Sequence, residues 1–263
     1  MTWIGSLARQ RADHLRLALV RTARDRTKSY RIRVVDWLDA RVTLGRRVKL
    51  ILVCGAWGAG TSAVAGMLAN LGAQGFGAYL LLSDPRTPVT YEFIPFRDMI
   101  RRLVSERAVV LLLGAEKVAP IALRRFQRRI KNQEFGPYDI RGSVPIFLKY
   151  PASALLLPQI CSVFDTRLIY VTRPLDDIER TRMRRKWPRQ FGRAGAEIIY
   201  SAMNRFELLH PHRILKLSFA DLTDAPAKCA QALAHFAGLE PDPIALKRAV
   251  DFIRPGQTGK ASD

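Results

Sequence analysis

A glycine-rich loop holds the residues of this sequence best suited to binding an anion. It reads Gly55-Ala-Trp-Gly-Ala-Gly-Thr-Ser62, which has the spacing of a P-loop. In such loops backbone N–H groups converge on an anion, and the positive end of the following helix strengthens the attraction. We predict an anion site formed by Gly58, Gly60, Thr61 and Ser62. A glycine turn that binds nothing is the alternative.

The loop lacks the residue that most P-loop enzymes require. Thr61 stands where the motif has lysine, and in nucleoside triphosphatases that lysine neutralises the β- and γ-phosphates. We also find no clear carboxylate after a predicted strand that could hold magnesium. A conventional ATPase or GTPase is therefore disfavoured, and an atypical P-loop phosphotransferase stays open as an alternative.

The elements around the loop predict how it is positioned. The apolar run 49–54 ends at the glycines and predicts a buried strand, while the apolar spacing in 61–71 predicts a helix. Further strands are predicted at 146–149, 167–171 and 213–217, and helices at about 92–105, 119–133, 153–160, 175–186, 195–209, 224–237 and 243–253. Residues 108–113 fit either a strand or the end of a helix. The alternation predicts an α/β fold with three layers and a central, mostly parallel sheet between helices.

The loop and its helix carry a resemblance to a known family. The stretch Gly60-Thr-Ser-Ala-Val-Ala-Gly-Met-Leu-Ala-Asn-Leu-Gly72 resembles the 5′-phosphosulfate loop and helix of bacterial sulfotransferases. The resemblance implies a P-loop-like fold over residues 48–255. It also implies 3′-phosphoadenosine 5′-phosphosulfate (PAPS) as co-substrate and no metal.

The resemblance implies a second anchor for the same co-substrate. Sulfotransferases have a strand that ends in Arg, with Ser or Thr eight residues later, and both bind the 3′-phosphate. Here Arg173 follows the run Leu168-Ile-Tyr-Val-Thr172, and Thr181 lies eight residues beyond it. An exposed arginine and a surface threonine are the alternative. The basic run 180–186 is followed by Trp187, so this helix offers a wall for an anionic acceptor or a ring that stacks on adenine; a solvated helix face is the alternative.

Two further matches supply catalytic candidates. Lys149-Tyr-Pro151 resembles the family's Lys-Asp-Pro element, and Thr87-Pro-Val-Thr-Tyr-Glu92 resembles a segment before its substrate-facing helices. Gly58 replaces the family's basic residue two positions before Gly60, a cation that contacts the 5′-phosphosulfate. We predict Lys149 as the substitute cation, with Arg86 as the other candidate. We predict Glu92, placed at a helix start, as the base; stabilisation of the helix dipole is its alternative role.

The net charge points to anionic partners. The chain of 263 residues has 43 Lys and Arg against 23 Asp and Glu, a net charge of +20, which attracts polyanions. Residues 1–47 hold 12 of the basic and 4 of the acidic residues. We predict a basic helical arm there that lies on an anionic membrane surface, with packing on its own domain or a partner as the alternative. Residues 256–263 are predicted to be a flexible tail.

The remaining features narrow the class of protein. Three widely spaced cysteines exclude a disulfide framework, and no run is long enough to span a bilayer. The start of the chain has no signal-peptide pattern, so we expect a cytoplasmic protein, peripheral at the inner membrane. We expect an acceptor that is a carbohydrate, lipid or small molecule, with an anionic glycan or lipid best suited to the charge, and we do not expect nucleic acid.

These observations predict a PAPS-dependent sulfotransferase that transfers a sulfuryl group to a hydroxyl or amine. Because Gly58 removes a catalytic cation, a non-catalytic, membrane-peripheral binding protein on the same fold is the main alternative.

Overall fold

The computed structural model describes residues 47–82, 89–138 and 144–253. The predicted arm over residues 1–47 and the tail at 256–263 lie outside this part of the chain, apart from Arg47, so the division into arm, body and tail stays a prediction. The described strands are β1 (Lys49–Cys54), β2 (Tyr79–Leu81), β3 (Val89–Phe93), β4 (Val104–Ser105), β5 (Val110–Leu111), β6 (Ile146–Lys149), β7 (Asp165–Thr172) and β8 (Ile214–Ser218). The α-helices are α2 (Thr61–Asn70), α3 (Ile94–Arg101), α4 (Ala115–Lys131), α5 (Leu157–Val163), α6 (Leu175–Arg184), α7 (Arg193–Leu209), α8 (Phe219–Asp224), α9 (Pro226–Ala237) and α10 (Pro243–Asp251).

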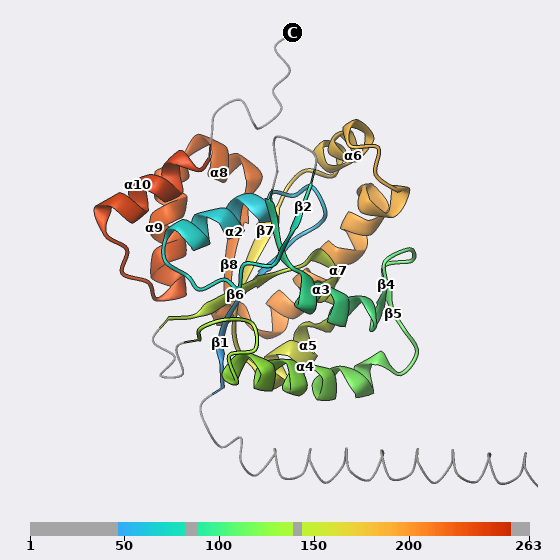
Figure 1. Ribbon diagram of the computed structural model, residues 1–263. Coiled ribbons are helices and arrows are strands. Elements are labelled where there is room, and N and C mark those ends of the chain that lie inside the picture. The colour runs from blue at the N-terminus through green and yellow to red at the C-terminus, as the bar shows by residue number, and fades with distance from the viewer. Residues whose placement is uncertain (1–46, 83–88, 139–143, 254–263) are drawn as a thin grey trace, which may run out of the picture. The chain divides into compact units, whose positions relative to one another are not determined.

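A four-stranded parallel sheet forms the centre of the body (Figure 1). The strand order is β6-β1-β7-β8, and β1 pairs with both β6 and β7, so that Leu52 lies opposite Leu148 on one side and Leu168 on the other. Parallel neighbours need crossover connections, which here contain the helices. The predicted α/β fold with a central parallel sheet is therefore confirmed.

Both faces of the sheet are covered, which explains the continuous apolar run of β1. Leu50 and Leu52 pack into a core with residues of α3, α4, α5 and α7, whereas Ile51 and Val53 pack into a second core with α2, α9 and α10. Successive side chains of a strand point to opposite faces. A strand buried on both faces must therefore be apolar at every position, and β1 is buried from Leu50 to Cys54.

The helix predicted at 92–105 is wrong at its start and its end. Residues Val89–Phe93 form β3, which pairs antiparallel with β2, and the helix occupies only Ile94–Arg101. Pro95 lies in the first turn of α3, where a missing N–H costs nothing, so the helix cannot begin much earlier. Glu92 is therefore a strand residue and does not stabilise a helix dipole. The ambiguous segment 108–113 contains β5, which pairs with β4.

None of the helices in the described ranges combines the length and apolar character needed to cross a bilayer.

The burial of β1 predicts where the fold is most sensitive to mutation. Leu52 is fully buried between β6 and β7, so Leu52→Ala should lower the free energy of unfolding by about 2–5 kcal/mol in urea denaturation. Leu208, exposed at the end of α7, provides the control, because Leu208→Ala should change stability by less than about 0.5 kcal/mol. Equal effects of the two substitutions would contradict the assignment of β1 to the core.

Candidate functional site

The carboxyl ends of the parallel strands meet at one cavity of about 1110 Å³, which we call the strand-end cavity. β1 leads into the glycine loop, β6 ends with Lys149, β7 is followed by Arg173, and β8 is followed by Phe219. Ligands of open α/β sheets bind at this edge. All eight predicted site residues line the cavity: Gly58, Gly60, Thr61, Ser62, Glu92, Lys149, Arg173 and Thr181.

The glycine loop wraps closely against the residues that follow β7 and β8. Gly58 and Gly60 have φ angles of +80° and +99°, a region that favours glycine. A Cβ atom on Gly58 would lie 3.2 Å from Thr181 Cγ2, and one on Gly60 would lie 2.5 Å from Phe219 Cδ2. No side chain caps the start of α2. The N–H groups of Ala63 and Val64 donate to the carbonyl of Gly60, so an anion in the cavity would use those of Thr61 and Ser62.

Arg173 connects the two predicted anchors directly. Its Nη1 donates a hydrogen bond to the carbonyl oxygen of Gly58 at 3.0 Å and to Thr181 Oγ1 at 3.3 Å. The Thr181 hydroxyl in turn donates to the carbonyl of Asp177 at 2.9 Å. The fold thus places Arg173, which follows β7, and Thr181 of α6 against the glycine loop that follows β1.

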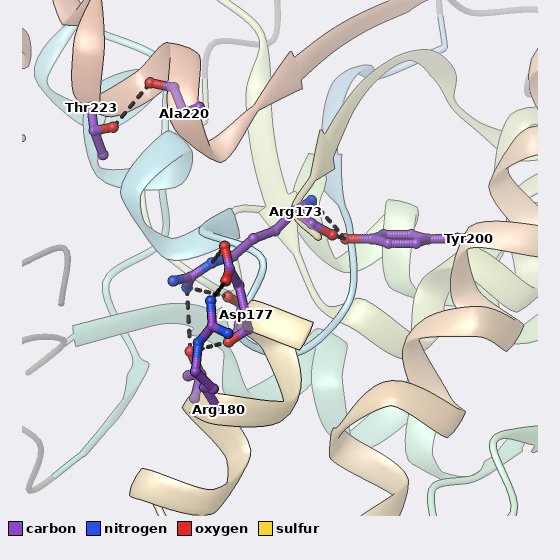
Figure 2. Close-up of polar contacts among 8 residues, drawn as sticks. Arg173, Asp177, Arg180, Tyr200, Ala220 and Thr223 are labelled. Carbon is purple, nitrogen blue, oxygen red and sulfur yellow. Dashed lines mark hydrogen bonds and ion pairs between the residues drawn. The ribbon is translucent and has the colours of Figure 1, made fainter. Parts of the chain in front are cut away.

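The surroundings of Arg173 fix its position and leave one donor unused. The guanidinium lies over the ring of Phe219 at 4.1 Å, and the Arg173 main chain exchanges hydrogen bonds with the Tyr200 hydroxyl, as Figure 2 shows. Burial lowers the pKa of Arg173 and raises the pKa of Tyr200 to about 12. Arg173 Nε is buried without a hydrogen-bond partner among the described residues; Asp177 Oδ2 is 3.8 Å away. A bound anion fits this orphaned donor.

Lys149 and Glu92 form a buried ion pair in the same cavity. Lys149 Nζ lies 2.8 Å from Glu92 Oε1 and 3.3 Å from Ser62 Oγ. The exposed fractions of the two charged side chains are only 4% and 9%. The Ser62 hydroxyl donates to the carbonyl of Thr90 at 3.1 Å. Lys149, at the end of β6, therefore brings a positive charge to the first turn of α2. Gly58 in the loop supplies none. Arg86, the other candidate cation, lies outside the described residues.

Sequence reasoning missed a second polar group on the cavity wall. The hydroxyl of Tyr150 donates to Glu106 Oε1, and Arg101 Nε lies 3.0 Å from Glu106 Oε2. Burial, together with the Glu106 carboxylate, raises the pKa of Tyr150. All three residues line the cavity. The resemblance drew attention to Tyr150 only as a departure from Lys-Asp-Pro, and nothing in the sequence linked it to Glu106 forty-four residues earlier.

Aromatic rings form another part of the wall. The rings of Trp57 and Phe191 lie 4.6 Å apart, and Trp187 meets Phe191 edge to face. Trp187, predicted to offer a ring for adenine, lines the cavity together with Trp57, Phe191 and Phe219. The positions of Trp57 in the glycine loop and of Phe219 after a predicted strand indicate from the sequence that both could lie near the site. No sequence pattern indicates this for Phe191. Within the described residues, no cluster of three His, Cys, Asp or Glu side chains could hold a metal ion.

Comparison with solved structures identifies the fold. The sulfotransferase STF1 of Mycobacterium tuberculosis aligns with a TM-score of 0.53 and 14% identity, over 80% of this chain and 73% of that one. The sulfotransferase domain of the Synechococcus PCC 7002 olefin synthase gives 0.47 and 18%, over 83% and 82%, and STF9 of Mycobacterium avium gives 0.46 and 12%, over 84% and 72%. No protein-family model and no curated protein matches the sequence. The chain therefore has a sulfotransferase-like fold.

The buried ion pair predicts a non-additive effect on stability. Glu92→Gln leaves Lys149 charged and uncompensated inside the body, so it should lower the free energy of unfolding by about 3–5 kcal/mol. In Glu92→Gln/Lys149→Met the unpaired charge is gone, and most of the loss should be recovered. Urea denaturation followed by circular dichroism measures all three proteins.

The exposed ion pair Lys247–Asp251 on α10 is the matched control for this cycle. Asp251→Asn, which removes the acidic partner as Glu92→Gln does, should change stability by less than about 0.5 kcal/mol. If Glu92→Gln were equally mild, or if the double variant were no more stable than the single one, the pair would not be buried as described.

Proposed function

We propose that this protein transfers a sulfuryl group from PAPS to a hydroxyl or amine of an acceptor. The observation that carries the proposal is the contact between two anchors for anions: the glycine loop after β1 and the Arg173–Thr181 pair after β7. Both line one cavity on a sulfotransferase-like fold. A molecule with phosphates at two ends of one nucleoside is suited to two such anchors.

Each anchor offers donors appropriate to one end of the co-substrate. The glycine loop and the first turn of α2 would hold the 5′ side through backbone N–H groups and the hydroxyls of Thr61 and Ser62. Arg173, with its orphaned Nε, and Thr181 would hold the 3′-phosphate. The rings of Trp57, Phe191 and Trp187 would supply an apolar surface for the adenine, which lies between the two anchored ends of the co-substrate.

Lys149 supports transfer as well as binding. PAPS supplies the sulfuryl group, and negative charge grows on the leaving side as the group departs, so a cation there stabilises the transition state. Gly58 cannot provide one. Lys149, which donates to Ser62 Oγ at the start of α2, occupies the cavity next to the 5′ anchor and can neutralise this charge.

Glu92 is the proposed base because it is the carboxylate adjacent to that cation. Its Oε1 accepts a hydrogen bond from Lys149 at 2.8 Å, which holds the carboxylate in place. An acceptor hydroxyl that enters between Glu92 and the sulfuryl group would give its proton to the carboxylate. Glu92 and Lys149 thus act as a positioned pair.

The acceptor and the arm remain proposals from sequence. Arg97, Arg101, Arg180 and Arg184 line the cavity, which favours an anionic glycan or lipid over a neutral acceptor. The basic arm over residues 1–47 is proposed to bind an anionic membrane surface. One observation favours a non-catalytic binding role: Gly58 stands where sulfotransferases have a basic residue. A measurement of turnover distinguishes this role from catalysis.

Binding of 3′-phosphoadenosine 5′-phosphate tests the Arg173 anchor. Arg173→Gln removes charged hydrogen bonds worth about 1.5–3 kcal/mol, so the affinity measured by calorimetry should fall about 10- to 150-fold. Arg205 is exposed on α7 outside the cavity, and Arg205→Gln should bind like the wild type. No binding by the wild type would remove the proposal, and preferential binding of magnesium ATP would favour a phosphotransferase.

Turnover tests the catalytic role of the Glu92–Lys149 pair. Release of 3′-phosphoadenosine 5′-phosphate from PAPS in the presence of acceptor panels should fall about 10²- to 10³-fold in Glu92→Gln/Lys149→Met, a variant chosen because it leaves no buried unpaired charge. Glu92→Asp, which keeps the carboxylate, should retain more activity. If the wild type binds the nucleotide tightly and turns over with no acceptor, the non-catalytic role replaces transfer.

A further inference from the structure

A group of exposed apolar side chains lies along β5, the turn that follows it and the first turn of α4. It consists of Val110, Leu112, Leu113 and Val118, which we call the leucine tip. The exposed fraction of Leu113 reaches 106%, so none of the residues that the structure describes covers this side chain. None of the four residues lines the strand-end cavity. Clustered apolar side chains on a protein surface mark contact with a protein or a membrane.

The leucine tip is held in position by its surroundings. Leu111 packs against the core, and strand alternation therefore directs its neighbours Val110 and Leu112 outward, where both are exposed. Leu112 donates its N–H to the carbonyl of Leu103, and its own carbonyl accepts from the N–H of Ala115, both at 2.9 Å. The exposed side chains therefore project from a hydrogen-bonded turn that leads into α4.

Helix α4, which begins within the leucine tip, carries positive charge. Its apolar residues Ala119, Leu123, Phe126 and Ile130 are buried, and Lys117, Arg124 and Arg125 are exposed. The helix contains six basic residues and one acidic residue, Glu116. Figure 1 shows α4 next to β4 and β5, whereas α10 lies across the sheet. The apolar segment thus leads directly into a helix whose exposed side chains are mostly cationic.

We propose that the leucine tip and the exposed face of α4 dock the folded body on an anionic lipid bilayer. Leu112 and Leu113 would enter the acyl-chain boundary, where burial of apolar area stabilises binding. Lys117, Arg124 and Arg125 would lie at the lipid phosphates, each contributing through attraction to the negative surface. This interaction is separate from the predicted arm and independent of the proposed reaction.

The charge of α4 argues against the other occupants. A symmetric dimer through this face would place the cations of one helix against those of the other. The segment 1–47 is itself basic, with 12 Lys and Arg against 4 Asp and Glu, so it is repelled by α4. A nucleic acid would satisfy the arginines and leave Leu112 and Leu113 in water. An anionic bilayer satisfies both kinds of side chain.

Co-sedimentation of the full chain with vesicles of phosphatidylglycerol and phosphatidylcholine in equal parts tests the surface. Leu112→Ser/Leu113→Ser should weaken partitioning about tenfold, and Arg124→Gln/Arg125→Gln should do the same. The matched controls lie on the other face of the sheet: Ile244→Ser replaces an exposed apolar residue of α10, and Lys228→Gln/Lys247→Gln removes two exposed charges. Both controls should partition like the wild type.

A depth measurement separates this surface from attachment through the arm alone. Cys54 and Cys229 are buried, so Cys161→Ser removes the accessible native cysteine. In that background, a nitroxide label on Leu113→Cys should move from water into the acyl region when vesicles are added. A label on Ile244→Cys should stay in water. If the label at position 113 stays in water on the bound protein, or if the leucine variant partitions unchanged, the proposal is wrong.

Two further results would overturn it. Equal weakening by the controls would mean that partitioning follows net charge alone. Binding of a nucleic acid that the arginine variant weakens and the leucine variant does not, with no vesicle binding, would assign the face to nucleic acid. Calorimetry with 3′-phosphoadenosine 5′-phosphate should be unchanged in all of these variants, so failure here does not affect the proposed reaction.

Discussion

The hydrogen bond from Arg173 to the carbonyl of Gly58 holds the strand-end cavity together. It crosses from the end of β7 to the glycine loop after β1, and it exists because these strands are hydrogen-bonded neighbours in the sheet. The left-handed backbone of Gly58, the stacking of Arg173 on Phe219 and the Tyr200 hydroxyl at the Arg173 main chain all fix the same guanidinium. With this group in place, the cavity holds two cationic side chains: Arg173, and Lys149 in its ion pair with Glu92.

Lys149 differs from Arg173 in how its charge is compensated. The Glu92 carboxylate balances it inside the protein. Arg173 Nε, in contrast, is buried with no hydrogen-bond partner in the part of the chain that the structure describes, and it lies 3.8 Å from Asp177 Oδ2. A buried charge without full compensation is costly, so the Arg173 end gains more from an incoming anion. The Lys149–Glu92 pair is already neutral overall, so we expect Lys149 to contribute less to binding of the co-substrate than to stabilisation of the transition state.

The sequence alone predicted the parallel sheet and the residues that its strands deliver to one edge. The stretches 50–54 and 168–171 within the predicted strands are apolar at every position because both faces are buried, and that pattern is local. Glu92 was placed at the start of a predicted helix, but the antiparallel pairing of β3 with β2 makes it a strand residue. The Tyr150–Glu106 contact and the position of Phe191 depend in the same way on tertiary packing, which no local pattern records.

The four strand ends of the cavity are supplied by residues that lie far apart in the chain, from the glycine loop near residue 58 to Phe219 after β8. No fragment that omits β8 retains the ring on which Arg173 stacks, so a competent pocket forms only when the whole sheet is assembled. Contacts between such distant residues make for slow folding, because long loops must close first. An occupant of the pocket therefore stabilises the entire body by mass action, rather than one lobe of it.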